Sequence, residues 1–359
     1  MTGLKIQLTK KNATNFVLDI ELHLPSQGVT ALFGRSGSGK TTLLRCIAGL
    51  EKSEIGEVSL NGELWQNSKH WLAPHKRSVG YVFQEASLFP HLSAKENLEF
   101  AIKRASVTPA IIDYQEVIAL MGIEPLLTKS PSQLSGGERQ RIAIARALLI
   151  QPKVLLMDEP LSALDEMLKQ DILPYLEALC KRVKIPIVYV SHSIDEVIRL
   201  ADYLVVLDNG KVIDQGVTQA VLGKLPANPI HFQEASVLIS GIITEQDDTW
   251  GLSTLQFANH SMRVKRNNEK IGDTIKLRVQ SKDVSISLSC EDSSSILNRL
   301  CVVIDDLITD SKDPSMVTVR MLAGSTPILA NITALSADRL NLRKGLNVIA
   351  QIKSAAVLR

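Results

Sequence analysis

The chain has 359 residues, of which 45% are hydrophobic, so it is long and apolar enough to form two domains with substantial cores. Its formal net charge is only +2 and it has no long run of Lys or Arg, which argues against a nucleic-acid partner held by bulk electrostatics. It has neither a signal-like N-terminus nor an apolar stretch of about 18 residues, so we expect a chain that is not secreted and does not span a bilayer.

A phosphate-binding loop is the first strong feature along the sequence. It follows the apolar run 29–33, which predicts a buried strand, and it precedes the run 43–48, which predicts a helix. Its glycines let several backbone N–H groups point at one anion, Lys40 can reach the phosphates, and Thr41 can bind Mg²⁺. A plain glycine turn before a helix is the alternative, but the strand and helix on either side favour the phosphate loop. The predicted ATP-binding residues here are Gly34, Arg35, Ser36, Gly37, Ser38, Gly39, Lys40, Thr41 and Thr42.

The middle of the chain is predicted to be mostly helical. Ser93 is placed to cap a helix, with Glu96 at the capping-box position, and 111–121 forms a second amphipathic pattern. The run 139–148 has apolar residues at helical spacing, so the Ser and Gly residues of 134–138 lie at a helix N-terminus. Free backbone N–H groups at such an end can bind an anion.

Two adjacent carboxylates end a second apolar strand over 154–159. In an ATP-hydrolysing site, Asp158 would hold Mg²⁺ through water and Glu159 would polarise the water that attacks the γ-phosphate. An Asp-Glu pair alone also fits a solvated turn after a core strand. The phosphate loop upstream favours the catalytic interpretation, so we expect ATP and Mg²⁺ as cofactors.

The last third of the chain has a different pattern. After a linker-like stretch at 226–229, helix signals give way to period-two alternation, as in 261–265 and 274–279. We therefore expect a small β-barrel domain over 235–359, after an ATPase domain over 1–230. A weak internal repeat is also present, in which five residues recur 73 positions later: Gly272, Ile275, Val279, Ser281 and Val284 match Gly345, Val348, Ile352, Ser354 and Val357.

These motifs together resemble the ATP-binding subunits of ABC transporters. The segment 134–138 resembles the family's signature motif, and Gln84 resembles the glutamine of its Q-loop. Asp165 matches the D-loop and His192 matches the switch histidine. The resemblance implies that Gln84, Glu159 and His192 are catalytic, and that Mg²⁺ is bound by Thr41, Gln84 and Asp158. The signature residues Leu134, Ser135, Gly136, Gly137 and Glu138 would bind ATP held by a partner subunit.

The same resemblance implies an architecture. The fold would be an α/β P-loop NTPase with a RecA-like core, an antiparallel β subdomain and a helical subdomain over about 88–150. Two copies would form a head-to-tail homodimer around two ATP molecules. The segment 88–92, just past the Q-loop, would receive an integral membrane permease, although a Phe89 buried in a loop core is the alternative.

Phe16 is the candidate for stacking on the adenine ring, because the family places an aromatic residue upstream of the phosphate loop. Phe16 also fits a core residue of a strand over 16–20. Both interpretations stay open at the level of sequence.

The segments 294–298 and 348–357 resemble molybdate-binding Mop modules, which have OB-like barrels and wrap a tetrahedral oxyanion. The resemblance implies an all-β, OB-like C-terminal Mop/TOBE-like regulatory domain, with an oxyanion-binding unit over about 290–358. Leu297 stands where the module often has Arg, so a guanidinium donor is missing there. The candidate oxyanion residues are Ser295, Asn298, Lys353 and Ser354.

The whole chain then resembles the ATPase subunit of a molybdate importer, with tungstate as a further solute. The resemblance implies a peripheral protein at the cytoplasmic face of the inner (plasma) membrane, with permease subunits as direct partners, a periplasmic solute-binding protein as an indirect one, and no nucleic acid. An importer of sulfate, sugar or polyamine is an alternative within transport. A soluble ABC ATPase or an oxyanion-storage protein is an alternative outside it.

Overall fold

The structure is a computed structural model that describes residues 3–11, 16–105, 112–222, 236–267, 269–289, 294–309, 313–353 and 356–358. The chain divides into two compact units, Met1–Thr218 and Gln219–Arg359. The linker expected at 226–229 lies outside the described residues. Within the described residues, no helix is both long and apolar enough to cross a lipid bilayer.

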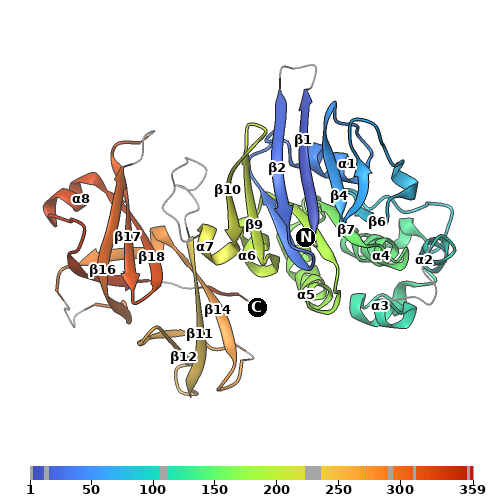
Figure 1. Ribbon diagram of the computed structural model, residues 1–359. Helices are drawn as coiled ribbons and strands as arrows, with labels where there is room; N and C mark the ends of the chain where they lie inside the picture. The colour runs from blue at the N-terminus through green and yellow to red at the C-terminus, as the bar shows by residue number, and fades with distance from the viewer. Residues whose placement is uncertain are drawn as a thin grey trace. The chain divides into compact units, whose positions relative to one another are not determined.

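Two sheets form the frame of the first unit (Figure 1). The smaller one is antiparallel, with the strand order β2-β1-β4-β5. Every second residue of β2 is buried, because side chains of a strand alternate between its two faces. The strands of this sheet are β1 (Leu4–Lys11), β2 (Val17–Leu24), β4 (Ile55–Leu60) and β5 (Glu63–Gln66).

The larger sheet has six strands in the order β10-β9-β3-β8-β7-β6. Its strands are β3 (Gly28–Phe33), β6 (Val79–Val82), β7 (Val154–Asp158), β8 (Pro186–Ser191), β9 (Tyr203–Asp208) and β10 (Lys211–Val217). All neighbours pair in parallel except β10, which runs antiparallel to β9. Strands β7 and β8 are buried along their whole length, which is why they read as continuous apolar runs. The carboxyl ends of parallel strands meet at one edge, where Phe33 pairs with Ser191 and Asp158 pairs with Val190.

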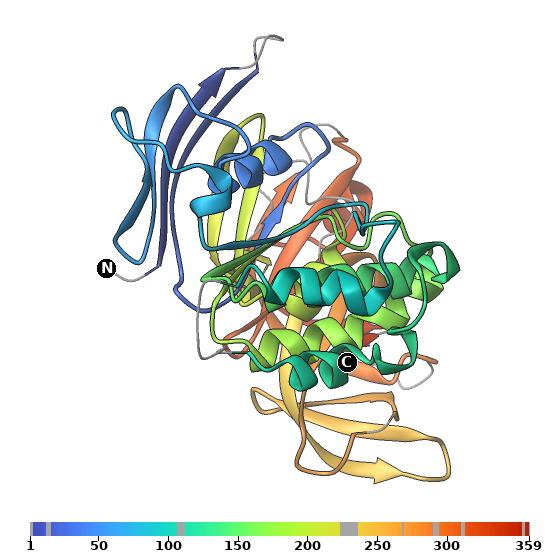
Figure 2. The same ribbon diagram turned by 90° about the vertical axis from the view of Figure 1, so that its right-hand side faces the viewer.

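Helices cover this frame. Those of the first unit are α1 (Lys40–Ala48), α2 (Ala94–Ile102), α3 (Tyr114–Met121), α4 (Gly136–Leu149), α5 (Glu166–Arg182) and α6 (Ile194–Leu200), with the short 3₁₀ helices η1 (Pro74–Lys76), η2 (Glu124–Leu126) and η3 (Pro131–Gln133). A further helix, α7 (Thr218–Leu222), spans the boundary between the units. Helix α4 packs against both α2 and α3, which are coloured teal to green in Figure 2.

The helix starts follow local capping chemistry. At α2 the predicted capping box is confirmed, since the Ser93 Oγ accepts the Glu96 N–H and the Glu96 carboxylate accepts the Ser93 N–H at 2.7 Å. The pattern over 111–121 begins as a helix only at Tyr114. The reason is that the Asp113 carboxylate accepts the N–H groups of the next turn and so caps the helix there.

The second unit is built from strands that pair only in antiparallel fashion among the described residues. Its two five-stranded sheets have the orders β13-β12-β11-β14-β20 and β15-β19-β16-β17-β18, which confirms the all-β, OB-like class. The strands are β11 (Ser236–Asp247), β12 (Leu252–Phe257), β13 (His260–Lys265), β14 (Thr274–Gln280), β15 (Val284–Ser287), β16 (Asn298–Thr309), β17 (Met316–Ala323), β18 (Thr326–Thr333), β19 (Asn347–Ile352) and β20 (Ala356–Leu358). Two short helices accompany them, η4 (Ser281–Asp283) and α8 (Ala334–Arg339).

The internal repeat is present in this unit as two similar halves. The strands β13-β12-β11-β14 and β18-β17-β16-β19 have the same order, and the first strand of each half has a β-bulge after Ile243 or Ile304. The Gly272 N–H donates to the Ile243 carbonyl, and the Gly345 N–H donates to the Ile304 carbonyl, both at 2.8 Å. The last strand of each half pairs with the other half, β15 with β19 and β20 with β14. The two halves therefore exchange a strand.

Candidate active site

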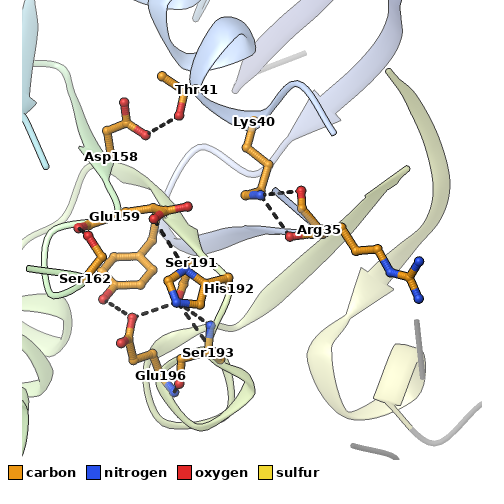
Figure 3. A network of polar contacts seen from close by, with 12 residues as sticks. Arg35, Lys40, Thr41, Asp158, Glu159, Ser162, Ser191, His192, Ser193 and Glu196 are labelled. Atoms are coloured by element: carbon orange, nitrogen blue, oxygen red, sulfur yellow. Dashed lines mark hydrogen bonds and ion pairs between the residues drawn. The ribbon is translucent and has the colours of Figure 1, made fainter. Parts of the chain in front are cut away.

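The phosphate loop connects the end of β3 to the start of α1, as its sequence indicates. The Lys40 Nζ turns back over the loop and donates to the carbonyl oxygens of Gly34 and Arg35, at 2.8 and 2.9 Å (Figure 3). Lys40 is only 4% exposed. Burial lowers the pKa of its ammonium, while the nearby carboxylates of Glu159 and Asp158 act in the opposite direction.

Two glycines of this loop have clear steric reasons. A Cβ on Gly34 would overlap the backbone carbonyl of Leu207, so the chain passes there with no room for a side chain. Gly39 has a φ of +101°, and a Cβ on it would lie 2.7 Å from Leu18 Cδ1. Both substitutions would displace the loop that holds Lys40.

The Asp158 carboxylate stands at the carboxyl end of β7 and accepts a hydrogen bond on each of its oxygens. The Thr41 hydroxyl donates to Oδ1 at 2.9 Å, and the Tyr81 hydroxyl donates to Oδ2 at 3.1 Å. Burial raises the pKa of Asp158, and these two hydrogen bonds partly oppose that shift. Tyr81 was not indicated by any sequence motif, because only the pairing of β6 with β7 brings it here.

Glu159 has an unusual backbone, with a φ of +45° in the left-handed region. Its N–H donates to the Val190 carbonyl at 3.2 Å, and its own carbonyl accepts the Ser162 hydroxyl at 2.9 Å. This conformation places its Oε2 3.3 Å from the Nδ1 of His192, whose side chain is half exposed (Figure 3). Strain of this kind is concentrated at functional sites in proteins.

A buried carboxylate supports the loop that carries His192. The Oε2 of Glu196 accepts the hydroxyls of Tyr189, at 2.8 Å, and Ser191, at 2.7 Å, and its N–H donates to the Ser193 hydroxyl. Glu196 is 5% exposed. Sequence reasoning missed it, although its spacing from His192 within one helical turn was a usable signal.

One pocket of about 460 Å³ lies at the phosphate loop, and Lys40, Thr41 and Glu159 are part of its lining. Phe16 is half-buried, lines this pocket and also packs against the core of the first unit, so both interpretations of it stay open. The lining residues are Phe16, Ser36, Gly37, Gly39, Lys40, Thr41, Thr42 and Glu159.

The residues present fit a nucleotide with its metal. The Ser38 Oγ is buried without a hydrogen-bond partner among the described residues, as expected of a group reserved for a ligand. A buried Lys and the N-terminus of α1 supply positive potential for phosphates. The hydroxyl and carboxylate oxygens of Thr41 and Asp158 are the ligands that Mg²⁺ prefers.

Gln84, Asp165 and the signature segment are not among the described residues that line this pocket. Gln84 is exposed, and among the described residues it makes no hydrogen bond to Thr41 or Asp158. Asp165 caps α5 by accepting the Leu168 N–H at 2.9 Å.

The signature segment does form a helix N-terminus, since α4 begins directly after Ser135. Its N–H groups are less free than the sequence suggested. The Ser135 N–H donates to the Glu138 carboxylate at 2.7 Å, and the Glu138 N–H donates to the Ser135 hydroxyl at 3.2 Å, so a capping box uses both. In the first turn of α4, the backbone N–H groups that the capping box does not use are those of Gly136 and Gly137.

The candidate oxyanion residues of the second unit are only partly assembled. Ser295 and Lys353 are exposed, and Ser354 lies outside the described residues. The amide of Asn298 is engaged with the backbone of Arg263, accepting at 2.7 Å and donating at 2.9 Å, so it holds β13 in place. Arg299, which sequence reasoning passed over, folds its guanidinium onto the carbonyl of Ile296 in the same segment, at 3.0 Å.

Comparisons with known proteins agree with this geometry. Residues 17–162 match the family profile described as ABC transporter, and residues 294–358 match the TOBE domain. The molybdenum import ATP-binding protein ModC of Pseudomonas aeruginosa is 48% identical over 362 residues, covering 100% of each chain. ModC of Methylococcus capsulatus is 48% identical over 344 residues, covering 96% of each.

Solved structures resemble the first part of the chain. The cbiO1 protein of Clostridium perfringens, part of an ABC transporter complex, has a TM-score of 0.54 and 29% identity over 62% of this chain and 90% of its own. A dimeric ATP-binding cassette bound to ADP and Pi has a TM-score of 0.50 and 28% identity over 60% of this chain and 98% of its own. The chain belongs to the ABC transporter family of ATP-binding proteins and, within it, to the molybdenum import ATP-binding proteins.

Proposed function

We propose that this chain hydrolyses ATP to drive the import of molybdate, with tungstate as a further solute, through a membrane permease. The ATPase part of the proposal is carried by Lys40, Thr41 and Glu159, which line one pocket. Asp158 contacts Thr41 and His192 contacts Glu159 beside it. The names of the relatives support the solute. A dimer and permease partners follow from membership of an import family.

Each residue of the pocket then has a chemical task. Lys40 and the loop N–H groups hold the phosphates. Thr41 and Asp158, with Gln84 in the nucleotide-bound state, hold Mg²⁺, which when bound neutralises charge on the β- and γ-phosphates. Glu159 orients and polarises the attacking water, and His192 contacts the γ-phosphate while it keeps the Glu159 carboxylate in place.

The signature segment completes the site of a second copy. The capping box at Ser135 fixes the first turn of α4 and leaves the N–H groups of Gly136, which is half-buried, and Gly137, which is buried, at the helix N-terminus. In a head-to-tail homodimer they meet the γ-phosphate held by the partner, and Asp165 lies at the same interface. Nucleotide then favours the closed dimer, and hydrolysis releases it.

The permease docks on the segment 88–92. Phe89 is half-buried there, with its ring 4.5 Å from that of Phe100 and under the guanidinium of Arg146. Because Arg146 belongs to α4, movement of this segment reaches the signature helix directly. The chain then works as a peripheral protein on the cytoplasmic face of the inner membrane.

The test is the ATPase activity of the reconstituted transporter with molybdate, tungstate or sulfate supplied to its binding protein. We expect stimulation by molybdate and tungstate and none by sulfate. Lys40→Ala is the matched control and should abolish nucleotide-dependent turnover with every anion. If only sulfate stimulates ATP hydrolysis, the assignment of molybdate as the solute is wrong, while the assignment of the chain as an ATPase stands.

We further propose that the second unit senses cytoplasmic molybdate and slows import. The support is the pairing of β16 with β19, which puts Asn298 opposite Ile352 and so brings the segment of Ser295 close to Lys353. Equilibrium dialysis of the full chain with molybdate is the test, with Lys353→Ala expected to weaken binding and Lys276→Ala, on β14, expected to leave it unchanged. The absence of saturable binding would remove this part of the proposal.

A further inference from the structure

Tyr81 reaches the candidate metal site from a strand that carries none of the predicted site residues. Strands β6 and β7 pair in parallel, with Tyr81 opposite Leu156, two residues before Asp158. This register lets the Tyr81 hydroxyl donate to Asp158 Oδ2 at 3.1 Å, while the other oxygen accepts the Thr41 hydroxyl at 2.9 Å. The Asp158 carboxylate is thus held at both oxygens.

The surroundings keep this tyrosine in one orientation. Its ring lies 4.4 Å from that of Phe83, and the Gln140 amide of α4 donates to the Phe83 carbonyl at 3.5 Å. The phenol hydroxyl is an uncharged donor, and it is directed at Asp158 Oδ2. A neutral donor in this place can orient a carboxylate without cancelling its charge.

We propose that Tyr81 is a positioning residue for Mg²⁺, acting through the Asp158 carboxylate. This inference rests on the proposed role of Asp158. A carboxylate fixed by a hydrogen bond presents its remaining lone pairs in one direction, so no rotational freedom is lost when a metal and its waters bind. Groups that orient metal ligands in this way contribute about 10-fold to 100-fold in metal affinity.

The Tyr81 side chain also links the metal site to the Q-loop segment, through its hydroxyl at one end and its ring at the other. Phe83 packs on the Tyr81 ring and directly precedes Gln84, so the side chain that orients Asp158 also contacts the segment that would bring Gln84 to the metal. Removal of the hydroxyl alone leaves that ring contact in place. A Tyr→Phe substitution therefore separates orientation of the carboxylate from packing of the segment.

The experiment measures ATP affinity of the full chain with and without Mg²⁺, together with Mn²⁺ affinity in the presence of ADP by electron paramagnetic resonance. We expect Tyr81→Phe to weaken metal binding about 10-fold and to leave metal-free ATP affinity unchanged. Excess Mg²⁺ should restore turnover. Tyr203→Phe, at another half-buried tyrosine of the same sheet, is the matched control and should change neither affinity.

Asp158→Asn separates failure of the inference from failure of the proposed function. If Asp158→Asn weakens metal binding and Tyr81→Phe does not, the inference is wrong and the site assignment stands. If neither variant affects metal binding, the role of Asp158 is wrong and the inference falls with it. If Tyr81→Phe lowers the affinity for ATP equally with and without Mg²⁺, the role of Tyr81 is purely structural. That result also overturns the inference.

Discussion

At the scale of single residues, Glu159 combines a strained backbone with the position expected of a catalytic base. Its φ of +45° is fixed by hydrogen bonds to Val190 and Ser162. Glu159→Gln keeps the shape of the side chain but cannot take up a proton. We expect ATP binding close to that of the unmodified chain and hydrolysis at least about 100-fold slower, measured as phosphate release from saturating ATP. A rate close to that of the unmodified chain would contradict the assignment.

The same residue allows a test of stored strain. Glycine adopts the left-handed conformation without steric cost, so Glu159→Gly should be more stable than Glu159→Gln by about 1 kcal/mol in urea unfolding. Both variants should be equally inactive. If Glu159→Gly is the less stable of the two, the backbone is not strained at this position.

The position of a residue is predictable from the sequence where the motif is local. Lys40 and Thr41 follow their loop directly, so their arrangement around one pocket was predictable. The contact of Tyr81 with Asp158 joins positions 77 residues apart, and it depends on β6 being the neighbour of β7. Strand order is set by tertiary packing, and no spacing in the sequence reports it.

At the scale of elements, the start of α2 depends on one hydroxyl. The Ser93 Oγ accepts the Glu96 N–H and donates to the Glu96 carboxylate at 2.8 Å. Ser93→Ala should lower the free energy of unfolding by about 1 kcal/mol, whereas Ser93→Thr keeps a capping oxygen and should change it little. Hydrogen exchange of the first turn of α2 and urea unfolding are the measurements, and equal stability of the two variants would contradict the capping role.

This cap has a defined pH dependence. The hydrogen bonds from Ser93 lower the pKa of Glu96 from its ordinary value of 4.5. A carboxyl group whose folded pKa is lowered stabilises the folded state above its unfolded pKa, and the contribution is lost as the pH falls through the folded value. The difference between the unmodified chain and Ser93→Ala should therefore be largest at neutral pH and shrink as the pH falls below 4.5. The sequence predicted this helix start because its signal is local, whereas the delayed start of α3 at Tyr114 required a choice between two starts.

At the scale of the whole molecule, the proposed head-to-tail dimer requires two copies to complete each ATP site. Light scattering of Glu159→Gln with Mg²⁺ and ATP should show a dimer, because nucleotide that is not hydrolysed holds the closed state. Lys40→Ala should stay monomeric under the same conditions. If Glu159→Gln stays monomeric even with its permease present, the proposed arrangement of signature segment against phosphate loop is wrong.

The strand exchange in the second unit makes its two halves depend on each other. Strand β15 pairs with β19, β20 pairs with β14, and one apolar core includes buried residues from both halves. Deletion of residues 294–359 removes β20, one of the two partners of β14, and β19, the partner of β15, and it opens that core. Hydrogen exchange should then show β11–β14 fully unprotected while the first unit keeps its protection. Deletion of residues 353–359 removes β20 alone, so it should expose the edge of β14 and leave the pairing of β15 with β19 intact. If β11–β14 keep their native protection from hydrogen exchange after the longer deletion, each half folds independently. The strand that one half receives from the other would then add nothing to the stability of the receiving half.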